Sequence, residues 1–367
     1  MKVAVITRHA ISNYGSLLQA YATQKVFEKM DTNCEIIDYI REDESYRNHE
    51  KTLLKRKTNW YKNPFKRFIY LALRQPESIF SGRMFEHERK KYLKLTSRYT
   101  SLQQLMDRPP LADLYVTGSD QVWGPTEDGS HDPAYCLVFT PECAKRISYA
   151  ASFGRTVMMP EIKMYYAKHL KRYNTIAVRE DSAVELMEKL GIRAEQVVDP
   201  TLLLSADEWR KISIQKSKRK YILVYQLHND PKLGEYAQKV AADKKLPLLR
   251  ISTHLHQITR PGKLIWNPSI AEFIDYIDCA ECLITDSFHG TAFAINLNTQ
   301  FVEVLPNNNT GTRNQSILKL TNLENRILKN ENDIELASIP IDFVPVNQII
   351  EFERKRSLKL LRNMIEE

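Results

Sequence analysis

The 367-residue chain predicts an α/β protein in which two parallel-sheet domains face each other across a cleft. Three observations predict this fold class. Strand, short polar loop and helix alternate through the first half of the chain, which is the pattern of an open parallel sheet. The alternation stops in a polar, lysine-rich stretch at 205–220 and then starts again. The length exceeds one ordinary domain, and 43% hydrophobic residues can form a real core.

We therefore expect an N-terminal domain at 1–205, a C-terminal domain at 206–345 and a C-terminal helix at 346–367. The expected strands are short apolar runs that end in polar or glycine-bearing loops. They lie at 3–7, 34–39, 112–117, 147–150, 175–178 and 196–198 in the first domain, and at 221–225, 247–251, 282–285 and 301–305 in the second. Ligands of such sheets bind beyond the carboxyl ends of the strands, so the loops there are the candidate sites.

A basic insertion at 45–105 interrupts the first domain. Residues 51–98 contain 14 Lys and Arg but three acidic residues, an excess larger than the net charge of +8 of the whole chain. Apolar side chains, among them Tyr61, Phe65 and Phe68, recur there at helical spacing between lysines and arginines. A cationic amphipathic helix of this kind can lie on an anionic membrane. The alternative is that its apolar face packs on the protein's own core. No known nucleic-acid-binding module accompanies the charge, so nucleic acid is not an expected partner.

The chain shows no secretory signal and no run of about 20 apolar residues that could span a bilayer. Its five cysteines are odd in number and widely scattered, which suits reduced thiols. These features predict a cytoplasmic protein, with peripheral contact on the inner face of the membrane through residues 51–98. No group of acids, histidines and cysteines has metal-ligand spacing, so neither a metal nor a cofactor is expected.

The most specific candidate site is the loop after the expected strand at 282–285. Ser287, His289, Gly290 and Thr291 open a helix there. A helix N-terminus offers unpaired N–H groups to an anion, and a histidine beside hydroxyls suits proton transfer. The alternative is that Ser287 is a helix cap and His289 an ordinary residue of the first turn.

Four other loops carry candidate residues. Arg179 ends a strand, where its guanidinium could bind a carboxylate or phosphate or could pair with Glu180 or Asp181. Arg313 lies in the polar loop 307–314 and is either an anion contact or a solvated residue. In the loop 118–123, Asp120 could activate a hydroxyl and the tryptophan could stack on a sugar; the alternative is a tight turn with a core tryptophan. The substrate-binding candidates of this loop and of the first βα turn, which lacks the dinucleotide and Walker patterns, are Asn13, Tyr14, Gly15, Ser16, Gly118, Ser119, Gln121 and Trp123.

These motifs occur in one order along the chain: 13–20 (NYGSLLQA), 118–123 (GSDQVW), 148–154 (SYAASFG), 178–182 (VREDS), 199–201 (DPT) and 286–290 (DSFHG). The ordered set resembles the polysaccharide pyruvyl transferase family, over about residues 3–330. The resemblance implies two Rossmann-like halves in a GT-B-like arrangement. It also implies transfer of the enolpyruvyl group of phosphoenolpyruvate to sugar hydroxyls, with formation of a ketal and release of phosphate.

By the same resemblance, His289 matches the active-site histidine of the family and Arg179 its arginine. Several members have an arginine two residues before that histidine, where this chain has Ser287. Donor binding would then depend on other cations such as Arg313. We expect His289 to be the acid or a phosphate contact, Asp120 the base, and the acceptor to be a sugar that a lipid pyrophosphate could carry.

Two other functions remain open. A GT-B glycosyltransferase that uses a nucleotide sugar would have the same architecture. A non-catalytic partner in polysaccharide assembly would explain Ser287 in place of the arginine.

Overall fold

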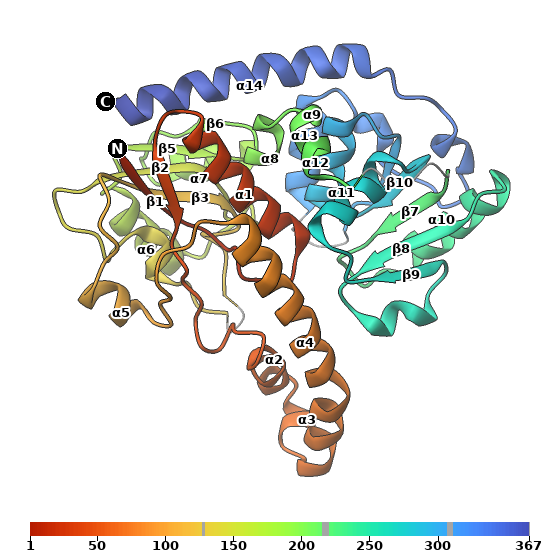
Figure 1. The fold of residues 1–367 in the computed structure, drawn as a ribbon, viewed down its shortest axis with the longest axis horizontal. Helices are drawn as coiled ribbons and strands as arrows, with labels where there is room; N and C mark the ends of the chain where they lie inside the picture. Colours follow the sequence, from red (N-terminus) through yellow and green to blue (C-terminus); the bar gives the residue numbers. More distant parts are fainter. Residues whose placement is uncertain (127–128, 215–219, 307–310, 367) are drawn as a thin grey trace. The chain divides into compact units, whose positions relative to one another are not determined.

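The computed structural model describes residues 1–126, 129–214, 220–306 and 311–366. The chain forms two compact units, Met1–Pro200 together with the end of the C-terminal helix from Lys359, and Thr201–Leu358. Each unit contains one parallel sheet covered by helices (Figure 1). The predicted α/β class with two parallel sheets is therefore confirmed.

The first unit has a six-stranded sheet in the order β2-β1-β3-β4-β5-β6. Its inner strands are apolar on both sides because helices cover both faces, and Val3, Ala4 and Val5 are wholly buried. The strands are β1 (Lys2–Ile6), β2 (Asn33–Ile36), β3 (Leu114–Asp120), β4 (Lys145–Ala151), β5 (Thr175–Val178) and β6 (Glu195–Gln196). The helices around this sheet are α1 (Tyr14–Glu28), α5 (Leu102–Asp107), the 3-10 helix η1 (Pro133–Cys136), α6 (Pro160–Leu170) and α7 (Asp181–Lys189).

The basic insertion is helical, as predicted, but its main helix is longer than the amphipathic pattern suggested. It comprises α2 (His49–Arg56), α3 (Thr58–Tyr61) and α4 (Pro64–Tyr92). The second half of α4 is anchored, because Gly82 lies so close to Tyr46 that a Cβ atom at position 82 would be 2.2 Å from the Tyr46 Cβ. The first half extends away from the sheet of its own unit (Figure 1) and exposes Phe65, Phe68 and Leu73 by more than two thirds. These three side chains therefore do not pack on the core.

The second unit has a five-stranded sheet in the order β11-β10-β7-β8-β9. The sequence missed β9, an edge strand of four residues that directly follows Pro261 and Gly262 and is only half-buried. The strands are β7 (Ile222–Tyr225), β8 (Leu248–Ser252), β9 (Lys263–Trp266), β10 (Cys282–Thr285) and β11 (Phe301–Glu303). The α-helices are α8 (Pro200–Leu203), α9 (Ala206–Ile212), α10 (Pro231–Asp243), α11 (Ile270–Asp278), α12 (Phe288–Leu297) and α13 (Thr312–Leu320). The helix α14 (Phe343–Glu366) begins in this unit, and its end from Lys359 belongs to the first unit. The 3-10 helices are η2 (Leu255–Thr259), η4 (Glu324–Arg326) and η5 (Ile334–Ala337).

Helix α12 is the central helix of this unit, since all ten of its residues are buried. A helix that is apolar all round belongs inside a protein rather than at its surface. Among the described residues, no helix combines the length and apolarity needed to cross a bilayer.

Candidate active site

In the first unit, polar residues converge at the carboxyl ends of β3, β4 and β5. Asp120 ends β3 with a φ of 72°, a left-handed conformation that aspartate tolerates better than most residues. Its Oδ2 accepts a hydrogen bond of 2.7 Å from the hydroxyl of Ser16 in the first turn of α1. The cap of that helix is Asn13, whose Oδ1 accepts the N–H of Gly15 at 2.8 Å and that of Ser16 at 3.4 Å. The structure thus brings the first predicted βα turn against Asp120.

Arg179, directly after β5, is the cation of this cluster and is 5% exposed. Its Nη1 donates to Oδ2 of Asp199 at 2.9 Å, and its Nε lies 3.6 Å from Oε2 of Glu180. Its Nη2 lies 3.9 Å from Oδ1 of Asp120. Burial alone would lower the pKa of Arg179, but the charges of Asp199, Glu180 and Asp120 raise it above its ordinary value. Three carboxylates around one arginine favour a structural role in ion pairing. One of them is Glu180, which was anticipated from the sequence as a pairing partner.

Serine hydroxyls complete this network. Ser119 on β3 donates to Oδ2 of Asp199 at 2.8 Å, and Ser152 after β4 donates to Oε1 of Glu180 at 2.6 Å. The network therefore joins the ends of four neighbouring strands, β3 to β6, and fixes the carboxylate of Asp120 in position.

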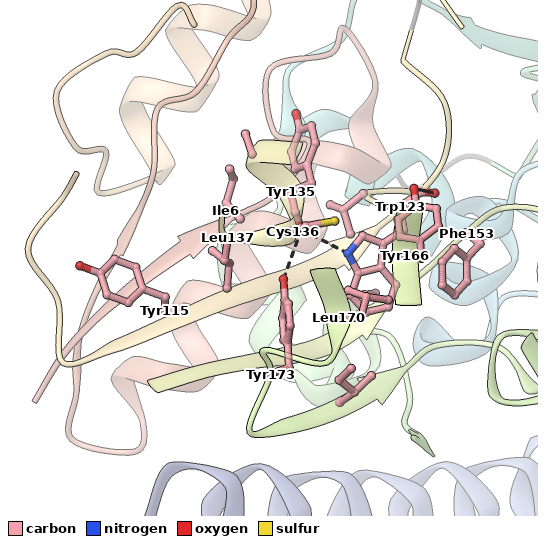
Figure 2. Packing of buried hydrophobic residues seen from close by; sticks show 14 of the residues in the cluster. Ile6, Tyr115, Trp123, Tyr135, Cys136, Leu137, Phe153, Tyr166, Leu170 and Tyr173 are labelled. Atoms are coloured by element: carbon pink, nitrogen blue, oxygen red, sulfur yellow. Dashed lines mark hydrogen bonds between the residues drawn. The ribbon is translucent and has the colours of Figure 1, made fainter. Parts of the chain in front are cut away.

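Trp123, proposed as a sugar-stacking residue, lies in the core of the first unit and is 1% exposed. Its indole N–H donates to the carbonyl of Tyr135 at 3.2 Å, and its ring contacts Phe153 and Tyr173 (Figure 2). Trp123 is therefore a core residue, as the alternative interpretation of this loop stated, and its ring is not exposed for stacking on a sugar. Other candidates of these loops are also buried, namely Tyr14, Gly15, Gly118 and Ser119, whereas Gln121 is half-buried.

In the second unit, the motif after β10 forms a tight, buried start to α12. The hydroxyl of Ser287 accepts the N–H of Gly290 at 3.3 Å, so Ser287 is the N-cap, as one alternative anticipated. Gly290 lies against β10, and a Cβ atom there would come within 2.6 Å of the Thr285 hydroxyl oxygen. His289 is 5% exposed in the first turn, where the N-terminal end of the helix favours negative charge.

Behind this turn lies Glu303, an acid at the carboxyl end of β11 that the sequence reasoning missed. It is wholly buried, and Nδ2 of Asn314 donates to its Oε1 at 2.6 Å. Its Oε2 is hydrogen-bonded to the hydroxyl of Thr291, which also donates to the carbonyl of Ser287 at 3.1 Å. Burial raises the pKa of Glu303 to about 8, against the opposing effect of its hydrogen bonds. A protonated Glu303 can donate its proton to the hydroxyl oxygen of Thr291. The hydroxyl proton of Thr291 is then available for the carbonyl of Ser287.

A second pair missed from the sequence is His228 and Asp286. The carboxylate of Asp286 accepts the backbone N–H of Leu227 at 2.7 Å and of His228 at 2.9 Å. Its Oδ2 lies 3.3 Å from Nδ1 of the His228 ring. Both residues line a cavity of about 340 Å³. The sequence contained a signal for this pair, because His228 follows the expected strand at 221–225 by three residues. The other candidate residues were chosen because they lie in loops at the ends of expected strands.

Arg313 lies in the first turn of α13 and is half-buried. Residues 307–310 of its predicted polar loop lie outside the described residues. Its neighbour Asn314 links α13 to the motif, since Nδ2 lies 3.5 Å from the carbonyl of Asp286. The predicted residues thus form two groups in different units: Asp120, Arg179, Ser16 and Ser119 in the first, and Ser287, His289, Gly290 and Thr291 in the second.

The sequence profile of the polysaccharide pyruvyl transferase family matches residues 13–309. This match confirms the resemblance drawn from the ordered motifs. A search of curated proteins gave no significant match.

Solved structures with a similar fold share little sequence with this chain. The MnaA–UDP co-structure from S. aureus has 12% identity and a TM-score of 0.53, with 100% of this chain and 98% of that chain covered. The UDP-GlcNAc 2-epimerase of Methanocaldococcus jannaschii has 11% identity and a TM-score of 0.52, with both chains fully covered. UGT89C1 of Arabidopsis thaliana has 10% identity and a TM-score of 0.50, with 99% of each chain covered. At these identities the likeness shows the fold alone, which is GT-B-like as predicted.

The arginine network makes a prediction about stability. Arg179→Met would leave buried carboxylates without their cation, which costs about 3–5 kcal/mol. Arg179→Lys keeps the charge but loses the planar fork, so we expect a smaller loss. Urea unfolding of both variants measures the difference. A methionine variant within about 0.5 kcal/mol of the wild type would mean that the network contributes nothing to stability.

Glu303 predicts how stability depends on pH. Its pKa rises from an ordinary value near 4.5 to about 8 in the folded chain, so the folded state holds the proton more tightly. The stabilisation is therefore fully present below pH 4.5 and is lost as the pH rises to 8. Glu303→Gln, which keeps a neutral side chain of similar shape, should remove this part of the decline.

The measurement is the melting temperature of both proteins between pH 5 and 8.5. The wild type should lose more stability than Glu303→Gln as the pH rises. Parallel curves would show that Glu303 binds no extra proton in the folded state.

Proposed function

Because the chain belongs to the polysaccharide pyruvyl transferase family, we propose that it transfers the enolpyruvyl group of phosphoenolpyruvate to a sugar. The product is a pyruvate ketal on a bacterial capsular polysaccharide, exopolysaccharide or cell-wall polymer, and phosphate is released. The observation that supports this most directly is the family match across both units, from the first βα turn to beyond β11.

His289 is the residue to which we assign the acid role or the phosphate contact. It lies in the first turn of α12, where the helix dipole and the N–H groups favour an anion such as a phosphate or carboxylate. Gly290 lets the helix start directly against β10, and Ser287 and Thr291 fix its first turn. A histidine held in this way can give a proton to the methylene carbon of the donor.

Asp120 is our candidate for the base that accepts a proton from an acceptor hydroxyl. The hydrogen bond from Ser16 and the nearby charge of Arg179 hold its carboxylate. In this role Arg179 acts through Asp120 rather than by binding the donor itself. Asn13, Gly15 and Gln121 border this cluster, and Arg313 borders the motif of the second unit.

A GT-B-like fold also suits a glycosyltransferase that uses a nucleotide sugar, which is the main rival. Stabilisation by a nucleoside diphosphate, without phosphate release from phosphoenolpyruvate, would favour that rival. If a nucleoside diphosphate does not stabilise the protein and no phosphate is released from phosphoenolpyruvate, the non-catalytic assembly partner is favoured.

The helices α2, α3 and α4 support a proposal about where the protein acts. Phe65, Phe68 and Leu73 are exposed on a segment with a large excess of lysine and arginine. Apolar side chains among cations are the features with which peripheral proteins bind anionic lipid surfaces. We therefore place the protein at the cytoplasmic face of the membrane, where it would meet an acceptor linked to a lipid pyrophosphate.

The catalytic assignment predicts that His289→Ala loses about 100- to 10,000-fold in turnover, the usual contribution of a general acid or base. The assay follows acceptor-dependent phosphate release from phosphoenolpyruvate in the presence of lipid-linked oligosaccharides. His254→Ala, an exposed histidine of the same unit, is the matched control and should keep wild-type activity. Wild-type rates in His289→Ala would remove His289 from the mechanism.

The membrane assignment predicts that the protein co-sediments with phosphatidylglycerol vesicles at low salt and is released at high salt. The double variant Phe65→Ser, Phe68→Ser should bind much less because it loses the apolar contacts. Phe352→Ser on α14, which is also strongly exposed, should bind like the wild type. If the wild type does not sediment with these vesicles, the membrane assignment is wrong.

A further inference from the structure

A cavity lies at the carboxyl end of β7 in the second unit. His228, Asn229, Asp230, Asp286 and the chain at 304–306 line its volume of about 340 Å³. Sites for small molecules have volumes of this order and contain a few convergent polar groups. The edge of the sheet on which it lies is also where ligands of parallel sheets bind.

His228 has the arrangement of an oriented acid–base residue. Asp286 is 2% exposed and is held by two backbone N–H groups, so its carboxylate cannot turn away from the ring. Its Oδ2 lies 3.3 Å from Nδ1 of the ring, so this edge of the imidazole packs against the carboxylate. Nε2, on the opposite edge of the ring, is then the nitrogen with which His228 can exchange a proton with a bound molecule.

Among the described residues, neither Arg260, beside the cavity, nor the wholly buried Arg250 of β8 donates a hydrogen bond to a carboxylate. Arg260 donates to Oδ1 of Asn229, a lining residue, and to Oε1 of Gln226 at 3.0 Å. Arg250 donates to the same Gln226 oxygen at 2.9 Å, and within the described residues its buried Nη2 has no hydrogen-bond partner.

Burial and then the charge of Arg260 lower the pKa of Arg250 to about 10, and the charge of Asp286 opposes them. Asp286 therefore offsets part of the charge of Arg250, whereas Arg260 donates to two amide oxygens and is the cation that an anion can approach.

We propose that this cavity holds the phosphate side of the donor, with Arg260 as the phosphate contact and His228 as a proton-transfer residue. The proposal rests on the proposed function, and it supplies the cation that Ser287 does not.

In the reaction, the first acceptor hydroxyl bonds to C2 of the donor, and its proton balances the one added to the methylene carbon. Protonated His228 then donates its Nε2 proton to the bridging oxygen as the C2–O bond breaks, and the electron pair leaves with the phosphate. The second acceptor hydroxyl bonds to C2, and its proton returns to His228. The histidine ends each turnover protonated, as it began.

Several charged groups surround His228. Asp286 faces Nδ1, Asp230 lines the same cavity while capping α10, and the guanidinium of Arg260 donates to Asn229. A variant that replaces the imidazole by an amide removes the proton-transfer group and leaves these charges in place.

The test compares His228→Gln and Arg260→Gln with matched variants of exposed neighbours, His256→Gln and Lys263→Gln. The assay measures kcat and KM for phosphoenolpyruvate, and calorimetry measures the affinity for inorganic phosphate. His228→Gln should lose about 100-fold or more in kcat. Arg260→Gln should weaken phosphate binding about tenfold or more.

Wild-type kcat in His228→Gln, or unchanged phosphate affinity in Arg260→Gln, would overturn the assignment. If the wild type releases no phosphate from phosphoenolpyruvate with any acceptor, the proposed function fails and so does the step at His228. The phosphate subsite then depends on calorimetry alone: binding that Arg260→Gln abolishes supports it, and equal binding in both proteins refutes it.

Discussion

Arg179 is a cation buried at the end of a central strand, and burying such a charge is costly unless carboxylates surround it. Asp199, Glu180 and Asp120 meet this requirement from three different loops. Each of these carboxylates in turn needs donors, which Ser119, Ser152 and Ser16 provide. One buried charge therefore determines how the loops after β3, β4, β5 and β6 and the start of α1 are held together.

The second unit also contains buried ionisable groups, and it accommodates them in two other ways. Asp286 accepts hydrogen bonds from two backbone N–H groups, and the His228 ring lies 3.3 Å from its carboxylate. Glu303 instead takes up a proton, because burial raises its pKa to about 8 and neither of its hydrogen-bond donors is charged. The two acids therefore differ in function: one can orient a histidine, and the other fixes the first turn of α12.

The sequence predicted the fold well because alternating apolar runs and polar loops are local signals. It also identified the loops at the strand ends, but not which side chains pair across them. Asp286 and His228 are 58 residues apart, and their contact follows from β7 and β10 being neighbours in the sheet. The burial of Trp123 and Glu303 likewise depends on segments distant in sequence, which no periodicity reports. The strand β9 was missed because four half-buried residues at a sheet edge carry too little pattern.

The distribution of charge constrains how an anionic donor can be bound. The basic excess of residues 51–98 exceeds the net charge of +8, so the remainder of the chain is slightly acidic. An anion can then be held only by cations whose charge is not already compensated. Three carboxylates surround Arg179, whereas Arg250 and Arg260 donate to amide and carbonyl oxygens. Arg250 is wholly buried, and the charge of Asp286 offsets part of its own. On electrostatic grounds, Arg260 is therefore a better phosphate contact than the arginine identified from the family motif.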